Sequence, residues 1–221
     1  MTQLVLATLA FLLAHYVSNT PLRPALVRAV GENGYLAVYS VLAFATLAWM
    51  IHAYPLAGYV HLWPKLRHVP ALVMPVACIL VVLGIASRNP TAVKQEGALR
   101  GEAPAHGIIR VTRHPVMWGF MLWSGAHVLA RGDLAALVFF GGFFVLAATG
   151  TVLIDRRKAR ALGPDWERFA AVTSNVPFVA IVQGRNRLVG REIGWWRPAA
   201  GLALYAALVL LHPWLFGVKP H

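Results

Sequence analysis

Cysteine is almost absent from this sequence, which has one such residue, Cys78, among its 221. A single cysteine excludes an intrachain disulfide and any zinc or redox site of the Cys-x-x-Cys type. It also excludes the Cys-x-x-Cys-His attachment of a c-type haem. Any haem in this protein therefore has to be held non-covalently.

Charged residues are also scarce. They make up 13% of the chain, against 58% hydrophobic residues, and the mean hydropathy is +0.62. Soluble domains of ordinary composition are about one quarter charged. The composition therefore indicates a polytopic membrane protein, and the length favours one transmembrane domain that extends over residues 1–221.

Acidic residues are the rarest charged group, with 8 Asp and Glu against 20 Lys and Arg, so the net charge is +12. In a soluble protein such an excess would suggest nucleic acid as a partner. Here the cations lie between apolar runs, and no polar surface with stacking aromatic residues is visible, so nucleic-acid binding is not expected. The excess is better explained by orientation in a membrane.

Six apolar runs follow one another along the chain. Each approaches the ~20 residues that a helix needs to cross ~30 Å of hydrocarbon. The sequence therefore predicts an all-α, polytopic transmembrane bundle with about six spans. The predicted spans cover residues 3–20, 34–54, 70–87, 114–131, 134–154 and 198–217.

The distribution of Lys and Arg orients these spans. Of the 20 cations, 16 lie in the first, third and fifth connections, and 4 lie on the other side. Cytoplasmic loops carry the excess of Lys and Arg. We therefore expect those three connections in the cytoplasm and both termini outside.

The segment "GPDWERF" within the fifth connection predicts a short helix that begins at Pro164. Trp166, Phe169 and Ala170 fall on one face of that helix. Two positions are open for it. It either lies on the membrane surface or packs under the bundle.

Several histidines lie within or near the apolar spans, among them His15, His52 and His127. Ionisable residues are costly there and usually face the bundle interior, and neutral imidazole is a common metal ligand. A single intramembrane histidine is more often a packing residue, but several in one small bundle favour ligation. Trp123 and His127 share a helix face because they are four residues apart.

The kind of metal site can be narrowed from the same spans. They contain almost no carboxylates, which argues against a zinc or di-iron centre. Haem requires only one or two axial ligands and a dry pocket, and flat aromatic neighbours suit a macrocycle. The residues therefore favour a non-covalent haem beside Trp123 and His127.

The "RHP" segment stands where a cytoplasmic connection enters the fourth span. Pro115 is tolerated in the first helical turn. We expect Arg113 and His114 to bind a phosphate, a haem propionate or a carboxylate. The alternative is that they only start the helix and anchor it at the interface.

The motif "GIIRVTRHPVMWGFMLWSGAHVLARGD" resembles the core signature of the NnrU family, which includes plant-type 15-cis-ζ-carotene isomerase. The resemblance continues in "AHYVSNTPLRPALVRAVGENGY", in "DRRKARALGPDWERF" and in "LHPWLF". It implies a bacterial inner-membrane protein that holds haem b through two histidines. By motif, these metal ligands are His15 and His127. The isomerase has cysteine where this chain has Ser124, so a thiolate ligand is excluded at that position.

A third histidine of the family matches His52. Its depth in the membrane makes it an alternative to His15 as the partner of His127. His52 and His127 both stand near the outer ends of their spans. His15 lies deeper, by about 12 Å relative to His127 at 1.5 Å per helical residue. The sequence therefore leaves open whether His15 or His52 pairs with His127.

Three functions are consistent with the resemblance. The first is a redox-dependent cis–trans isomerase acting on a hydrophobic polyene in contact with membrane lipid. The second is a haem protein of denitrification that responds to nitric oxide without isomerase activity. The third is a membrane methyltransferase using S-adenosylmethionine, since such enzymes share an "RHP" segment. Asp155, Trp166 and Phe169 stand where those enzymes have glutamate and tyrosines, which weakens that reading.

Overall fold

The computed structural model describes residues 1–100 and 105–218, and within them it contains helices and no strand. The elements are α1 (Thr2–Tyr16), η1 (Val17–Asn19), α2 (Leu22–Ala53), α3 (Val69–Ile85), η2 (Glu96–Arg100), η3 (Gly107–Arg110), α4 (Pro115–Arg131), α5 (Leu134–Leu162), α6 (Pro164–Val172), α7 (Val179–Val182), α8 (Gly190–Ile193) and α9 (Trp196–Phe216). The predicted all-α class is confirmed.

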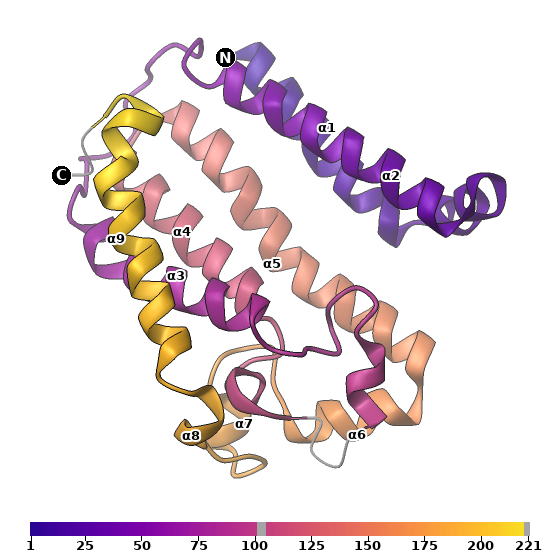
Figure 1. The fold of residues 1–221 in the computed structure, drawn as a ribbon. Coiled ribbons are helices and arrows are strands. Elements are labelled where there is room, and N and C mark those ends of the chain that lie inside the picture. The colour runs from indigo at the N-terminus through magenta and orange to yellow at the C-terminus, as the bar shows by residue number, and fades with distance from the viewer. Residues whose placement is uncertain (101–104, 219–221) are drawn as a thin grey trace.

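Helix α5 lies in the middle of the bundle (Figure 1). On one side α1 packs against it, and α2 forms an antiparallel hairpin with α1; on the other side α4 packs against α5, and α3 packs against α4 and α9. A core cluster of α1, α2 and α5 residues joins the hairpin to α5 and includes Leu4, Phe11, Met50 and Phe140. The hairpin therefore touches the rest of the bundle mainly through α1.

Each of the six predicted spans coincides with a helix. Four helices are long and apolar enough to cross a membrane, namely α1 with η1, α2, α5 and α9. Helices α3 and α4 have 17 residues each, which is below the length of those four. Of the two, α3 counts as apolar along its length. The membrane character is thus supported, whereas the count of six spans stays a prediction.

Helix α2 begins earlier than the predicted span at residue 34, because it also includes the preceding turn region from Leu22. A break at Gly31, with φ 74° and ψ 165°, separates the two parts. Glycine adopts this positive φ without a steric penalty, which explains how the chain turns there. The apolar run detected in the sequence is the part after the break.

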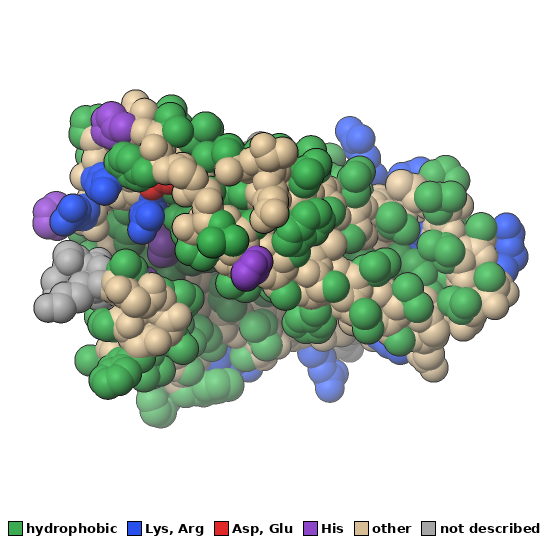
Figure 2. Space-filling view, turned by 90° about the horizontal axis from the view of Figure 1, so that it is seen from above, with side chains coloured by type: hydrophobic (Ala, Val, Ile, Leu, Met, Phe, Trp, Pro, Cys, Tyr) green, Lys and Arg blue, Asp and Glu red, His purple; other side chains and the backbone are tan. Residues whose placement is uncertain are grey.

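The outer surface of the helices is largely apolar. Val41, Phe44, Leu72 and Leu210 are each more than two-thirds exposed. Hydrophobic side chains cover much of the face in Figure 2. Soluble proteins rarely expose apolar surface on this scale, so these side chains are expected to contact lipid.

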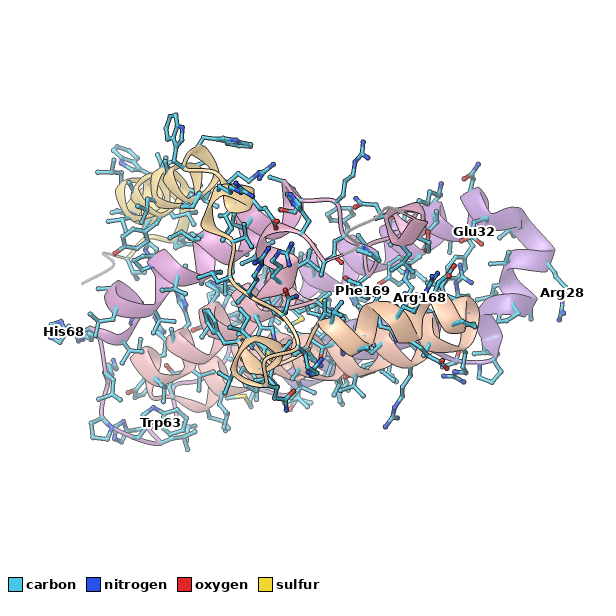
Figure 3. All side chains as sticks on the ribbon, turned by 90° about the horizontal axis from the view of Figure 1, so that it is seen from below. Arg28, Glu32, Trp63, His68, Arg168 and Phe169 are labelled. Atoms are coloured by element: carbon cyan, nitrogen blue, oxygen red, sulfur yellow. The ribbon has the colours of Figure 1, made fainter. Side chains whose placement is uncertain are left out.

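Different segments of the chain lie at the two ends of the bundle. The start of α1 and the end of α9 lie at the same end of the bundle in Figure 1. Figure 3 shows Trp63 and His68 at one end of the molecule and Arg28 and Glu32 at the other. Six helices that run between two ends bring the chain back to the end where it started.

Close contact between α3 and α4 depends on glycine. A Cβ atom at Gly119 would lie 2.9 Å from the carbonyl oxygen of Ala77 and 2.6 Å from a methyl carbon of Val81. Small residues allow the backbones of membrane helices to approach in this way. A Cβ at Gly125 on the same helix would meet nothing nearer than 3.7 Å.

We expect Gly119→Ala to destabilise the protein by about 1–3 kcal/mol, because the added methyl group overpacks the interface. Gly125→Ala is the matched control, since it adds the same methyl group to the same helix at ordinary van der Waals distance from its neighbours. It should leave stability unchanged or raise it slightly. Thermal unfolding in detergent checks both, and equal melting temperatures for the two variants would contradict the described packing.

Helix α6 begins at Pro164, as predicted, and its position decides between the two open alternatives. Trp166 and Phe169 are 4% and 0% exposed. They belong to a core cluster with Leu83 and Ile109, among others. The helix therefore packs under the bundle rather than lying on the membrane surface.

Candidate functional site

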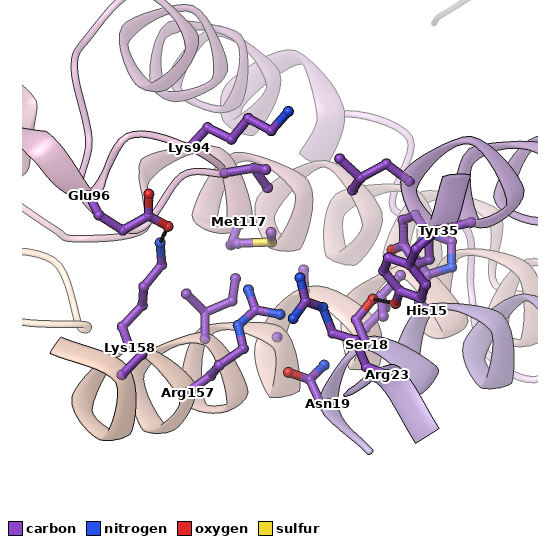
Figure 4. A pocket seen from close by; sticks show the side chains of 18 of the residues that line it. His15, Ser18, Asn19, Arg23, Tyr35, Lys94, Glu96, Met117, Arg157 and Lys158 are labelled. Atoms are coloured by element: carbon purple, nitrogen blue, oxygen red, sulfur yellow. Dashed lines mark hydrogen bonds and ion pairs between the residues drawn. The ribbon is translucent and has the colours of Figure 1, made fainter. Parts of the chain in front are cut away.

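A cavity of about 640 Å³ lies between the α1–α2 hairpin and the helices α4 and α5. Both α1 and α4 contact α5, and residues of all three helices line the cavity. Its wall has an apolar part made of aromatic and aliphatic side chains, and a polar part (Figure 4). The apolar part includes Phe11, Met117, Phe120, Phe143 and Leu146, and the polar part includes His15, Ser18, Asn19, Arg23, Glu32, Tyr35, Lys94, Glu96, Arg157 and Lys158.

His15 is the one intramembrane histidine expected as a ligand that lines this cavity. Its Nδ1 lies 2.8 Å from the carbonyl oxygen of Phe11, one turn earlier on α1. Its ring contacts those of Phe11 and Tyr39, with centroids 4.2 and 5.7 Å away. If Nδ1 carries the proton that this bond needs, Nε2 bears the free lone pair that a metal requires.

His127 lies on α4, outside the residues that line the cavity. Its Nδ1 is 2.8 Å from the carbonyl oxygen of Trp123, which gives it the same local arrangement as His15. The expected face shared with Trp123 is confirmed, since the two ring centroids are 5.7 Å apart. Phe140 of α5 covers the imidazole with a centroid separation of 5.0 Å.

The two expected ligands are at different depths along α5. Tyr16, which follows His15, bonds its hydroxyl to that of Thr149, whereas His127 packs against Phe140. Nine residues of helix separate Thr149 from Phe140, which corresponds to about 13 Å. Two nitrogens that bind one metal lie about 4 Å apart, since each bond is about 2 Å long.

The space between these histidines is occupied by aromatic rings. Phe11 contacts Phe143, and Phe143 contacts Trp123, with centroids 5.1 Å apart in both pairs. In the arrangement described, these rings keep His15 and His127 from binding one iron together. The structure does not bring His15 and His127 together, and their pairing at one metal stays a prediction.

His52 is near the end of α2, where its side chain is exposed, and it does not line the cavity. Ser124 is fully buried and donates its hydroxyl to the carbonyl oxygen of Phe120 at 2.7 Å. Ser124 is likewise not among the residues that line the cavity. Neither residue is placed to contact a ligand there.

Arg113 and His114 already have an anion from the chain itself. Asp155 of α5 accepts from the guanidinium of Arg113 at 2.6 Å and faces Nε2 of His114 at 2.7 Å. The side chains of Arg113 and His114 are 12% and 1% exposed. Of the three kinds of anion expected for Arg113 and His114, the structure places a carboxylate beside them, that of Asp155 in the same chain. Binding of an external anion by these two residues stays a prediction.

The same network accounts for the residues that the methyltransferase reading invoked. Asp155 is bound to Arg113 and His114, and the guanidinium of Arg113 lies 5.8 Å from the ring centre of Trp166. Phe169 packs in the core under the bundle. None of these residues lines the cavity.

A second carboxylate fixes the loops on this side of the bundle. Glu192 of α8 accepts from Arg110 at 2.6 and 2.9 Å and from the backbone N–H of Gly107 at 2.8 Å. The bonds from Arg110 are the main reason that the pKa of Glu192 falls from 4.5 to about 2. Charged Glu192 therefore stabilises the contact between α8 and η3.

We expect Glu192→Gln to lower the melting temperature at neutral pH, with an effect that disappears in acid. A carboxyl whose pKa is depressed on folding stabilises fully above its unfolded pKa, near 4.5, and loses this contribution as the pH falls towards 2. Melting curves of wild type and variant between pH 7 and 2.5 check this. A difference that is constant over that range would show that the charge is not what stabilises the contact.

The charged rim of the cavity was not found by reading the sequence. Arg23 and Arg157 stand 134 positions apart, and each looked like an ordinary cytoplasmic cation. The sequence held only an indirect sign of this position. Arg157 directly follows the apolar part of α5, and a long cationic side chain there extends towards the membrane interface.

Comparison with known proteins places these features in a family. The sequence matches the description "NnrU protein" over residues 3–220. It is 40% identical over 82 residues to 15-cis-zeta-carotene isomerase, chloroplastic, of Arabidopsis thaliana, and 38% identical over 82 residues to the protein of the same name from Zea mays. In both cases the match covers 37% of this chain and 22% of the relative. No solved structure is significantly similar. The chain belongs to the NnrU family.

Proposed function

We propose that this protein is an integral membrane, haem b-dependent cis–trans isomerase of a hydrophobic polyene. The observation that carries the proposal is the cavity, because it combines an apolar wall with an imidazole whose Nε2 is free. The partial match to two 15-cis-zeta-carotene isomerases supports a polyene as the substrate class.

The residues of the cavity fit a haem. His15 would hold the group through its imidazole, Phe11 and Phe143 would line it with apolar surface, and the charged residues of the cavity would provide cations for its anionic groups. Its volume of about 640 Å³ is within the ~300–1,000 Å³ typical of small-molecule sites. A bound haem would supply an iron that changes redox state and exchanges electron density with a conjugated ligand. The family resemblance proposes His127 as the second ligand.

The chain's own contribution to isomerisation is to hold a polyene dry and in place. Phe120, Phe143 and Leu146 offer apolar contacts along the cavity. A conjugated hydrocarbon needs such contacts and no hydrogen bonds. Exclusion of water also protects a reduced cofactor from side reactions.

The proposed setting is the bacterial inner membrane, with six spans and both termini periplasmic. Helices α3 and α4, at 17 residues, are at the short end of the range for transmembrane helices. They pack against α5 and α9, which are long enough to span. The positive-inside distribution then assigns the end with Arg23 and Arg157 to the cytoplasm.

The experiment is an anaerobic assay of the reduced, haem-loaded protein with 15-cis-ζ-carotene in liposomes. Chromatography measures the ratio of the isomers over time. We expect the isomer with a trans double bond at C15 to accumulate faster than in protein-free liposomes. Haem-free protein is the control. An unchanged ratio together with tight nitric oxide binding by the ferrous protein would replace the isomerase with the nitric oxide-binding alternative.

A further inference from the structure

The cavity carries more positive charge than a hydrocarbon substrate can use. Its lining includes the four cations Arg23, Lys94, Arg157 and Lys158, against the two carboxylates of Glu32 and Glu96. This leaves an excess of two positive charges. Charged groups at the edge of a membrane cavity are costly without a partner, so the excess indicates a ligand group that is anionic.

Two of the cations are already paired. Lys158 donates to Glu96, and this bond is the main reason that the pKa of Glu96 lies below its usual value. Arg23 donates to Glu32 at 2.6 Å, and its guanidinium lies 5.4 Å from the ring centre of Tyr35. These contacts hold the two side chains in position.

Arg157 has no such partner. In the described part of the chain, no ion pair or hydrogen bond is formed by its half-buried guanidinium. Figure 4 shows that Arg157 and Arg23 extend into the same space, one from α5 and the other from the start of α2. Glu32 already neutralises Arg23, so the charge without a partner at this point is that of Arg157, and an anion between the two guanidinium groups could bind both.

The position of the two arginines gives the shape of the ligand. Arg157 lies about one helical turn beyond Ile154 and about two turns beyond Gly150. Both residues line the cavity next to Leu146 and Phe143. The anionic group would thus lie at the membrane surface, and the rest of the ligand would extend along apolar side chains towards Phe11. This is the shape of an amphiphile with an anionic head.

We propose that Arg23 and Arg157 form a clamp for the anionic head of an amphiphile that occupies the cavity. The planar guanidinium group matches carboxylate and phosphate oxygens with paired hydrogen bonds. Two groups share this chemistry: the two propionates of haem and the phosphate of a lipid. The haem alternative rests on the function proposed above. The two propionates would balance the excess of two positive charges, and a single lipid phosphodiester would balance one of them.

The test uses Arg157→Gln, with Arg156→Gln as the matched control because Arg156 is the exposed neighbour on the same helix. Purified full-length protein is titrated with hemin and with hemin dimethyl ester, whose propionates are uncharged, and binding is read from the Soret band. In a second arm, native mass spectrometry records binding of phosphatidylglycerol and of phosphatidylcholine.

We expect Arg157→Gln to weaken one anionic ligand by about tenfold or more, since a charge-assisted bond is lost. Arg156→Gln should bind as wild type. Loss for hemin but not for its diester assigns the clamp to propionates, and selective loss for phosphatidylglycerol assigns it to a lipid phosphate. Either outcome supports the clamp.

Two results separate the failure of the clamp from that of the haem hypothesis. If wild type does not bind hemin at all, the haem hypothesis fails, and the lipid arm still decides on the clamp. If Arg157→Gln binds hemin and phosphatidylglycerol as tightly as wild type does, the clamp is wrong, whatever cofactor the protein carries.

Discussion

Replacement of His15 by alanine is expected to remove most of the haem that purifies with this protein. His15 is the imidazole that lines the cavity, and its Nδ1 is bound to Phe11, which leaves Nε2 for iron. Loss of groups that only orient a metal ligand costs about 10–100-fold in affinity, so loss of the ligand itself should cost at least as much. The ratio of Soret to protein absorbance after purification measures the result.

Two histidine variants serve as comparisons. His52→Ala should keep the haem, because His52 is exposed and away from the cavity. His127→Ala decides whether the second ligand proposed from the family is used. Loss of haem in that variant would support His127 as the second ligand and would require a haem-bound arrangement different from the one described. Full haem content in His15→Ala would overturn the assignment of the cavity.

The sequence predicted the helices well because apolar length is a local property. All six runs became helices, and "GPDWERF" began a helix at Pro164. The face shared by Trp123 and His127 was also predictable, since it depends only on the four-residue spacing. Such features need no knowledge of which helices are neighbours.

What the sequence could not provide was the pairing of residues across helices. Asp155 looked like the remnant of another enzyme's motif, yet it binds Arg113 and His114, which precede it by 42 and 41 positions. Arg23 and Arg157 meet only because the hairpin folds back against α5. One hint was present: a carboxylate at the end of an apolar helix needs a cation, and the "RHP" segment supplied one.

Removal of the charge on Asp155 should destabilise the protein strongly. Its carboxylate is the anion for Arg113 and His114, whose side chains are largely buried. Nε of Arg113 is also buried and has no hydrogen-bond partner among the described residues. Breaking a buried pair by neutralising one member typically costs about 3–5 kcal/mol, because the other charge is left uncompensated. We therefore expect Asp155→Asn to unfold at a much lower temperature than wild type in the same detergent.

Arg156→Ala, on the exposed neighbour of Asp155, is the control and should change stability by less than about 0.5 kcal/mol. The double variant Asp155→Asn with Arg113→Gln should recover part of the loss, because it removes the charge that the first substitution leaves unpaired. Additive effects of the two substitutions would mean that they do not act on one ion pair. A melting temperature of Asp155→Asn equal to that of wild type would show that the network contributes nothing to the fold, and it would free Asp155 for a role in binding or chemistry.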